Sequence, residues 1–373
     1  MQMNHSVDPQ HTFVVIMAGG VGSRFWPISR TESPKQFLDI LGCGRTLIQM
    51  TYDRMLPMTA ADQILVVTNA RYRDDVAAAL PDLPAENILC EPMMRNTAAC
   101  LAYANSVIAQ RDEAAQIVVA SADHLIADED RFRSVISAAL GLAARSGELV
   151  SVGIEPTRPD TGYGYIQHGP RATHATGPAD ERLRSVAKFV EKPELARAQD
   201  FLASGDYAWN AGIFVWNLSD IQAAFRVHLP EMDALFSAHA SDFGTDREIA
   251  AIEAIYGSCQ NISIDYGIME RVGSVGLVLG DFGWSDLGTW QSLYQQLDRD
   301  AAGNATRGVP AEKLLLEGAT GNMISAGDGK MVVLRGLDNF IVVDTPDALL
   351  ICPRDQEQWV KTVVGELSAR GQL

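Results

Sequence analysis

The chain has 373 residues, 47% of them apolar, and its 30 Lys and Arg stand against 47 Asp and Glu, for a net charge of −17. This is the composition of a globular protein long enough for about two domains. The excess of negative charge excludes a surface built to neutralise nucleic-acid phosphates or anionic lipid. We therefore expect neither a nucleic-acid nor a membrane partner.

The first segment, residues 1–11, is a polar lead-in without the basic residues and apolar stretch of a signal peptide. No apolar run approaches the ~18 residues that a membrane span requires. The cysteines form an odd set without a CxxC pair, which speaks against a disulfide framework or a zinc site. We expect a cytoplasmic protein whose cysteines are reduced core residues, namely Cys43, Cys90, Cys100, Cys259 and Cys352.

Short apolar, β-branched runs alternate with stretches of helical spacing along most of the chain. Helical spacing is clearest at residues 97–110 and 131–145. The alternation predicts βαβ crossovers, and therefore a Rossmann-like α/β fold with a mostly parallel sheet and helices on both faces. Ligands bind such folds at the carboxyl ends of the strands. The runs that we interpret as strands are residues 12–18, 63–68, 116–121, 149–154 and 274–279.

The sequence pattern changes near residue 300, where glycines begin to separate short apolar runs. This change predicts a larger α/β domain over residues 12–299 and a small β-rich C-terminal domain over residues 300–373. The second domain should end in a helix at residues 355–369. A Gly- and Pro-rich segment, residues 169–180, predicts an exposed hairpin or loop within the larger domain.

The most informative stretch is AGGVGSRFWPISRTESPKQF at residues 18–37, which directly follows the first strand. Gly19, Gly20 and Gly22 allow the backbone to approach a ligand closely and, with Ser23, to turn N–H groups toward an anion. A dinucleotide-binding loop would open directly into a helix, and a P-loop would contain GK followed by Ser or Thr. Neither pattern is present, so the stretch is a different kind of phosphate loop.

Three cations follow these glycines: Arg24, Arg30 and Lys35. In an acidic protein, cations at this place favour phosphate binding over the alternative, a surface loop with incidental charges. The stretch resembles the sugar nucleotidyltransferases, which carry GGxGxR followed by PK. In the form GGxGxRxWPxSRxxxPKQF it resembles the mannose-1-phosphate guanylyltransferases. The resemblance continues to about residue 354 and makes residues 12–299 the nucleotidyltransferase domain.

A second landmark, ILCEPMMRNTA at residues 88–98, opens a helix. Its polar residues Arg95, Asn96 and Thr97 suit a helix cap, and on the sequence alone this interpretation is as good as a binding role. In the family that the chain resembles, this segment lies beside the nucleobase, whose edge needs donors and acceptors. The resemblance therefore makes the three residues candidates for nucleotide binding.

The strand at 116–121 runs into Asp123 and His124. A lone Asp at a strand end is often a helix cap, but opposite a triphosphate it is a natural Mg²⁺ ligand. The family has PADH where this chain has SADH, a change that keeps the carboxylate. By resemblance, Asp123 also contacts the nucleotide, and Asp286 in FGWSDLGTW is the second carboxylate on Mg²⁺. We expect His124 to orient its neighbours rather than to act as a base.

Three further motifs carry residues that the resemblance assigns to the sugar phosphate. We expect Glu191 to accept hydrogen bonds from sugar hydroxyls, Lys192 to reach the phosphate, and Asn210 to read a hydroxyl. The alternative for Glu191 and Lys192 is that one of these adjacent side chains is merely solvated. The alternative for Asn210 is that it is a turn residue before a strand. The motifs are TGYGYI with Tyr163 and Gly164, FVEKP with Glu191 and Lys192, and WNAGIF with Asn210.

Residues 263–270, SIDYGIME, also match the family's pattern closely. No firm physical role follows from them beyond capping a helix through Ser263 or Asp265. They identify the family more than they explain its chemistry.

The resemblance therefore implies an enzyme that converts GTP and α-D-mannose 1-phosphate to GDP-mannose and pyrophosphate. The expected catalytic cations are Arg24 and Lys35 on the triphosphate and Lys192 on the attacking phosphate. Mg²⁺ on Asp123 and Asp286 should bridge the nucleophile and the α-phosphate. Many relatives continue into an isomerase domain, which we do not expect in this protein, so we expect nucleotidyl transfer alone.

Two alternatives stay open. The first is a different sugar 1-phosphate or a different base, because fold and phosphate machinery are shared across sugar nucleotidyltransferases. The second is a regulatory relative that binds a sugar nucleotide without catalysis, although such a protein would be expected to have lost a carboxylate or a cation of the set. A homodimer is also left open.

Overall fold

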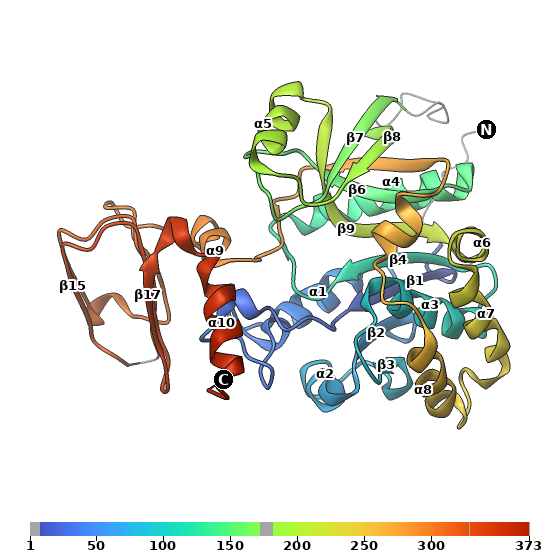
Figure 1. The fold of residues 1–373 in the computed structure, drawn as a ribbon, viewed down its shortest axis with the longest axis horizontal. Helices are drawn as coiled ribbons and strands as arrows, with labels where there is room; N and C mark the ends of the chain where they lie inside the picture. Colours follow the sequence, from blue (N-terminus) through green and yellow to red (C-terminus); the bar gives the residue numbers. More distant parts are fainter. Residues whose placement is uncertain (1–7, 172–181, 328, 373) are drawn as a thin grey trace. The chain divides into compact units, whose positions relative to one another are not determined.

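The computed structural model describes residues 8–171, 182–327 and 329–372 (Figure 1). It divides into two compact units, each assembled from separate segments of the chain. Unit 1 consists of the residues up to Gly19 together with 51–122 and 126–284. Unit 2 consists of residues 20–50, 123–125 and those from Ser285 onward.

Unit 1 is built on a mixed sheet, which in the described residues has nine strands in the order β3-β2-β1-β4-β9-β6-β10-β8-β7. The first four strands are parallel. β9 is antiparallel to both β4 and β6, while β6 and β10 are parallel to each other. The bounds are β1 Thr12–Met17, β2 Ile64–Asn69, β3 Ile88–Glu91, β4 Gln116–Ser121, β6 Leu149–Ile154, β7 Tyr165–Arg171, β8 Leu183–Val190, β9 Tyr207–Asn217 and β10 Val275–Gly280.

Helices cover both faces of this sheet, and α3, α6, α7 and α8 stand together in Figure 1. Phe13 and Val15 of β1 share one core cluster with residues of these four helices. Val14 and Ile16 point to the opposite face and are fully buried as well. Burial on both faces explains why the strand is apolar throughout. The helices are α2 Arg73–Ala79, α3 Asn96–Ala109, α4 Glu129–Ser146, α5 Leu195–Ser204, α6 Leu218–His228, α7 Pro230–Ala238 and α8 Glu248–Ser258.

The end of β1 lies directly beside the end of β4. Their register pairs Met17 with Ser121, and the amide of Ala122 donates to the Met17 carbonyl at 2.9 Å. The glycine loop and Asp123 therefore start from neighbouring strand ends. Short strands and one helix fall at the unit boundaries, namely β5 Leu125–Ile126, β11 Trp284–Ser285 and α1 Leu47–Met55.

In its described residues, unit 2 combines short, mostly parallel strands with two helices. β12, β14 and β16 pair in parallel, β17 joins β16 in antiparallel fashion, and β13 pairs with β15. One core cluster contains Met323 and Ile341 of these strands together with Trp290. Phe25 and Ile40 of the segment 20–50 belong to the same cluster. The bounds are β12 Ala305–Arg307, β13 Leu314–Glu317, β14 Met323–Ser325, β15 Val332–Arg335, β16 Phe340–Asp344, β17 Leu349–Pro353, α9 Trp290–Gln296 and α10 Trp359–Ala369.

The predicted fold class is confirmed, and the structure adds the antiparallel strands β7, β8 and β9. Each of the five predicted strands is present within one residue of its expected bounds. The domain boundary near residue 300 stays a prediction. β7 takes in the start of the expected loop at 169–180, and residues 172–181 lie outside the described part.

The cysteines are all free, but one expectation about them is wrong. Cys100, Cys259 and Cys352 are buried, whereas Cys90 is half-buried and Cys43 is exposed. Cys43 follows Gly42 on a surface turn, where its amide donates to the Asp39 carboxylate. Within the described ranges, no helix is both long and apolar enough to cross a membrane.

Candidate active site

In unit 2, the glycine loop is shaped around the side chain of Lys35. Gly22 adopts a left-handed conformation with φ of 70°, directly before the 3₁₀ turn η1, Ser23–Phe25. A Cβ added to Gly22 would lie 2.5 Å from the Cβ of Lys35. The Lys35 amide bonds to the Val21 carbonyl, and the Gln36 side-chain amide donates to the carbonyl of Gly20. Gly22 is therefore needed for two reasons: the Lys35 side chain leaves no room for a Cβ, and the φ angle is left-handed.

Lys35 links the segments that carry the two predicted metal ligands. Its ammonium, which is almost fully buried, lies 2.8 Å from Oδ2 of Asp123. It also donates to the backbone carbonyls of Asp286 at 2.8 Å and of Leu287 at 3.0 Å. The three donors of an ammonium group are thus engaged with two segments that are 163 residues apart in the chain (286 − 123). In this structure Lys35 positions Asp123 and the Asp286 backbone, and its contact with a triphosphate stays a prediction.

Asp123 is held in its ionised form. Burial opposes its ionisation, but the Lys35 ammonium and, to a smaller extent, His124 keep the pKa of the carboxyl below its usual value. Nε2 of His124 lies 4.0 Å from Oδ1 of Asp123. An ionised carboxylate is the form that a divalent cation requires.

Arg24 has an unused donor on the same loop. It lies in η1 and is half-buried, and its Nε is buried without a hydrogen-bond partner among the described residues. Leaving a guanidinium donor unpaired in a buried place is costly, so an anion is the natural guest there.

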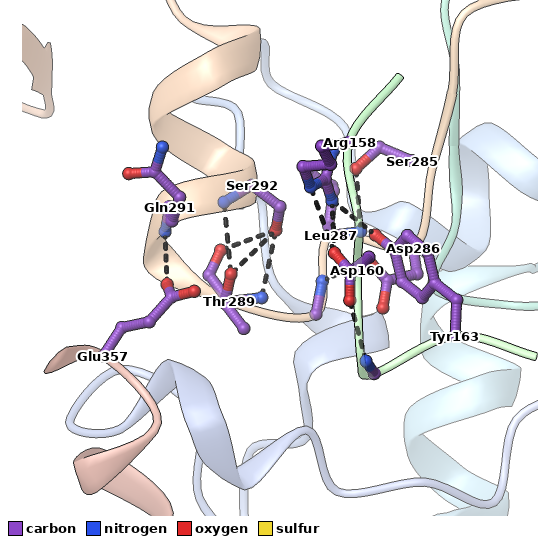
Figure 2. Close-up of polar contacts among 12 residues, drawn as sticks. Arg158, Asp160, Tyr163, Ser285, Asp286, Leu287, Thr289, Gln291, Ser292 and Glu357 are labelled. Atoms are coloured by element: carbon purple, nitrogen blue, oxygen red, sulfur yellow. Dashed lines mark hydrogen bonds and ion pairs between the residues drawn. The ribbon is translucent and has the colours of Figure 1, made fainter. Parts of the chain in front are cut away.

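The loop of Asp286 is braced at both ends (Figure 2). Oδ1 of Asp286 accepts from the Gly288 amide at 2.9 Å, and the Leu287 amide donates to Oγ of Ser285. Thr289 and Ser292 then form a reciprocal cap at the start of α9. These contacts order the backbone carbonyls that Lys35 uses.

These residues suit a magnesium ion only if the substrate completes its coordination. The described residues contain no group of three or more His, Cys, Asp or Glu that could hold a metal ion by itself. The carboxylates of Asp123 and Asp286 supply hard oxygen donors, and Mg²⁺ typically takes one or two carboxylates and fills its remaining positions with phosphate oxygens and water. The donor set is compatible with Mg²⁺ on that condition.

In unit 1, the predicted sugar residues form one cluster. A Cβ added to Gly164 would lie 2.5 Å from Oε2 of Glu191 and 3.3 Å from Cβ of Asn210. The amide of Asn210 donates to the Gly164 carbonyl, and that of Lys192 to the Tyr163 carbonyl. Lys192 has a positive φ of 44° and pairs with the adjacent Glu191. Asn210 lies inside β9, so the alternative of a turn residue is excluded.

Tyr163 is fixed by a group of residues that the sequence analysis did not single out. Arg158 donates to Oδ2 of Asp160 and, at 3.2 Å, to the Tyr163 hydroxyl, as Figure 2 shows. Its guanidinium also lies over the rings of Tyr163 and Trp209. Tyr163 meets Trp209 edge-on, with ring centroids 5.1 Å apart. The ring is thereby held in one orientation.

The predicted base-binding residues at the start of α3 are engaged in local structure. Nε of Arg95 donates to the Tyr256 carbonyl at 2.8 Å. Asn96 has a φ of 66°, and its side chain accepts from the Thr97 amide. Oγ1 of Thr97 accepts from the Ile264 amide at 2.8 Å. The N-cap residue Arg95 makes no side-chain capping bond to α3, so only the local bond from the Thr97 amide to Asn96 supports the capping interpretation, and the nucleotide role stays a prediction.

The unexplained segment 263–270 connects this helix start to the sugar cluster. The Ala98 amide donates to the Ile262 carbonyl, and Thr97 holds Ile264 as described above. One residue on, Oδ1 of Asp265 accepts from Nδ2 of Asn210 at 2.8 Å. Ser263 does cap the following turn through the Tyr266 amide, whereas Asp265 does not cap. Burial raises the pKa of Asp265, against the effect of the bond from Asn210.

Glu91 is a second residue that sequence reasoning missed. It ends β3, is 8% exposed, and accepts from the Tyr256 hydroxyl at 2.9 Å. Burial raises its pKa to about 7, against the effect of that bond. A Cβ added to Gly19 would lie 3.5 Å from its other carboxylate oxygen. The only sequence signal was its place at the carboxyl end of a parallel strand.

The comparisons with known proteins concern the family of the chain. The family described as Nucleotidyl transferase matches residues 13–303, and a MannoseP isomerase/GMP-like beta-helix domain matches residues 318–367. The mannose-1-phosphate guanylyltransferase of Escherichia coli (strain K12) is 37% identical over 96% of this chain and 74% of its own length. The alginate biosynthesis protein AlgA of Pseudomonas aeruginosa is 36% identical over 96% of this chain and 72% of its own.

A solved structure extends the likeness to three dimensions. The Thermus thermophilus protein, described as a mannose-1-phosphate geranyltransferase, has a TM-score of 0.83 and 31% identity, over 96% of this chain and 99% of its own. Family pattern, curated relatives and fold thus point the same way. The chain is an enzyme of the nucleotidyl transferase family and belongs with the mannose-1-phosphate guanylyltransferases.

Proposed function

We propose that the chain transfers GMP from GTP to α-D-mannose 1-phosphate, giving GDP-mannose and pyrophosphate. The observation that carries the proposal is the Lys35 contact set, because it gathers Asp123 and the Asp286 loop beside the glycine loop. The names of the relatives add the substrates, since the Escherichia coli enzyme is a mannose-1-phosphate guanylyltransferase.

The reaction needs no general base. The second pKa of a phosphate monoester is near 6, so the sugar phosphate is largely a dianion at neutral pH. One of its oxygens attacks the α-phosphorus of GTP in line, and the bond to the bridging oxygen breaks as pyrophosphate leaves. Catalysis is then a matter of positioning two polyanions and stabilising the charge on the leaving group.

Three cations share that task in the proposed mechanism. Arg24, with its unpaired buried Nε, binds the triphosphate together with the amides of Gly20, Gly22 and Ser23. Lys35 supports this loop through its contacts with Val21 and Gly22, and Lys192 holds the attacking phosphate. The 60% exposure of the Lys192 side chain leaves it accessible to a ligand.

Asp123 and Asp286 are the residues that would hold Mg²⁺. When bound, the ion supplies charge stabilisation at the α-phosphate and orients the attacking oxygen. The contribution of the chain itself is to keep Asp123 ionised through Lys35 and to brace Asp286 through Gly288.

For the base, we propose Glu91 in addition to Arg95, Asn96 and Thr97. Guanine presents N1–H and N2–H₂ donors side by side, and a carboxylate accepts such a pair through its two oxygens. Adenine offers a donor beside an acceptor at the same edge and would leave one carboxylate oxygen unmatched. An unmatched buried group costs about 1–3 kcal/mol, enough for a preference of roughly tenfold or more.

The test is a pyrophosphate-release assay over four nucleoside triphosphates and several sugar 1-phosphates. We expect GTP with mannose 1-phosphate to give at least about tenfold higher kcat/KM than any other pair. If kcat/KM with ATP or dTTP equalled that with GTP, the guanylyl assignment would fall and only the assignment as a sugar nucleotidyltransferase would stand. Tight GTP binding without turnover of any sugar phosphate would instead favour the regulatory alternative.

A further inference from the structure

The Asp265 carboxylate and the Gly212 amide both hydrogen-bond to the side-chain amide of Asn210. Nδ2 of Asn210 lies 2.8 Å from Oδ1 of Asp265, and Oδ1 of Asn210 accepts from the Gly212 amide at 3.1 Å. An ionised carboxylate only accepts and a backbone N–H only donates, so the reversed amide would lose both bonds. The polarity of the Asn210 side chain is therefore determined by its neighbours.

Asp265 is itself anchored from two sides. It begins the π-helical turn η7, Asp265–Met269, in which the Glu270 amide donates to its backbone carbonyl. The preceding residue, Ile264, is fully buried and bonded to Thr97 at the start of α3. The carboxylate thus has little freedom to follow a moving side chain.

With this polarity, the second N–H of the Asn210 amide is a donor and not an acceptor. Asn210 and Glu191 both pack against Gly164, because a Cβ there would lie 2.5 Å from Oε2 of Glu191 and 3.3 Å from Cβ of Asn210. A hydroxyl group placed between them accepts from the amide and donates to the carboxylate. Hydroxyls are the groups that can do both at once.

We propose that Asp265 is a positioning residue that sets the polarity of Asn210, so that Asn210 and Glu191 together read one hydroxyl of the sugar ring. This inference rests on the proposed function, because it takes the sugar 1-phosphate as the ligand. Asp265 acts through Asn210 and does not itself contact the sugar. It gives residues 263–270 a role that their sequence did not reveal.

The experiment compares the full-length wild type with Asp265→Asn and Asn210→Ala on mannose 1-phosphate and its 2-, 3-, 4- and 6-deoxy forms. We expect the wild type to lose about 10- to 100-fold in kcat/KM for one of these deoxy sugars. On mannose 1-phosphate itself, the kcat/KM of both variants should fall below that of the wild type by a similar factor. On that deoxy sugar, the kcat/KM of both variants should be almost the same as that of the wild type. Calorimetric affinity for GTP should stay within about twofold of the wild type.

Glu253→Gln is the control, because Glu253 is an exposed carboxylate of α8 in the same unit. It should keep the deoxy-sugar pattern of the wild type. A variant that merely loosens the fold would lower kcat/KM on every sugar by the same factor, and would lower the melting temperature with it.

The outcomes separate the two proposals. If the wild type turns over no sugar phosphate with GTP, the proposed function fails and the role of Asp265 falls with it. Suppose instead that the wild type is active, and that Asp265→Asn lowers kcat/KM by the same factor on every deoxy sugar as on the complete sugar. Then only the Asp265 inference is overturned. The Asp265 inference is likewise overturned if Asn210→Ala loses the sensitivity of kcat/KM to removal of one hydroxyl while Asp265→Asn keeps it.

Discussion

Gly22 and Lys35 touch so closely that a methyl group on the glycine would lie 2.5 Å from the Cβ of the lysine. The contact is with the first side-chain carbon and not with a flexible end, so the loop itself would have to shift. Because the same lysine holds Asp123 and the Asp286 loop, a shift of the loop reaches the proposed metal ligands.

The first prediction concerns this contact. Gly22→Ala should lower the free energy of unfolding by about 2 kcal/mol or more, because a left-handed φ costs ~1–2 kcal/mol and the clash adds to it. Gly20→Ala is the matched control for stability, since a Cβ there has nothing within 4 Å. Urea denaturation of both variants measures the difference. Equal stability of the two would show that the loop adapts without strain.

The second prediction concerns the Lys35–Asp123 pair. Lys35→Met should destabilise the protein by about 2–3 kcal/mol, below the 3–5 kcal/mol of a fully buried pair because the Asp123 side chain is one-third exposed. Lys35→Met with Asp123→Asn should cost less than the two single changes together. Strict additivity in this double-mutant cycle would mean that the pair contributes nothing to stability.

The pH dependence of this pair has a definite sign. The native pKa of Asp123 lies below its unfolded value, so its contribution is present above the unfolded pKa of about 4. It is lost as the pH falls through the native pKa. The stability difference between wild type and Lys35→Met should therefore shrink in acid.

The third prediction concerns magnesium. Asp286→Asn and Asp123→Asn should each lower kcat by on the order of 10²-fold, because charge stabilisation by the ion is worth several kcal/mol. The Mg²⁺ concentration for half-maximal rate should rise in parallel. Asp281→Asn, at an exposed carboxylate that pairs with Arg131, is the control and should behave like the wild type. Normal Mg²⁺ dependence in either variant would remove that residue from the metal site.

The fourth prediction concerns Glu91. Its native pKa of about 7 lies above the ordinary value of 4.5, so its favourable contribution is complete below pH ~4.5 and is lost as the pH rises through 7. A shift of this size corresponds to about 3 kcal/mol. Relative to Glu91→Gln, the wild type should therefore become less stable between pH ~5 and pH ~8. A constant difference across that range would contradict the raised pKa.

The fifth prediction concerns Lys192. Lys192→Ala should weaken the use of mannose 1-phosphate by about tenfold or more while GTP binding stays nearly intact, because the lysine belongs to the sugar cluster. Lys188→Ala, at an exposed lysine of β8, is the control. Titration calorimetry with each ligand measures the two affinities. Equal loss for both ligands would assign Lys192 to another role.

Local sequence was sufficient for the five predicted strands and for the kinds of residues around the site. The β-branched runs of β1, β4 and β6 reveal strands because burial on both faces requires apolar residues throughout. The glycines and cations of residues 18–37 reveal an anion loop because few other uses combine those residue types. The carboxylate of Asp123 was expected from its place after a strand.

Tertiary structure decided which of these residues meet. Lys35 lies in space beside Asp123 and the backbone of Asp286, which is 251 residues away in the chain, and no pattern in the chain encodes such a contact. Glu91 and Asp265 lie in stretches that the sequence analysis singled out, but nothing in those stretches distinguishes the two from surface carboxylates. Their burial, and the bonds from Tyr256 and Asn210, arise only when distant strands and turns pack together. Burial and pairing are what shift a pKa or fix an amide, and both are properties of the packed chain.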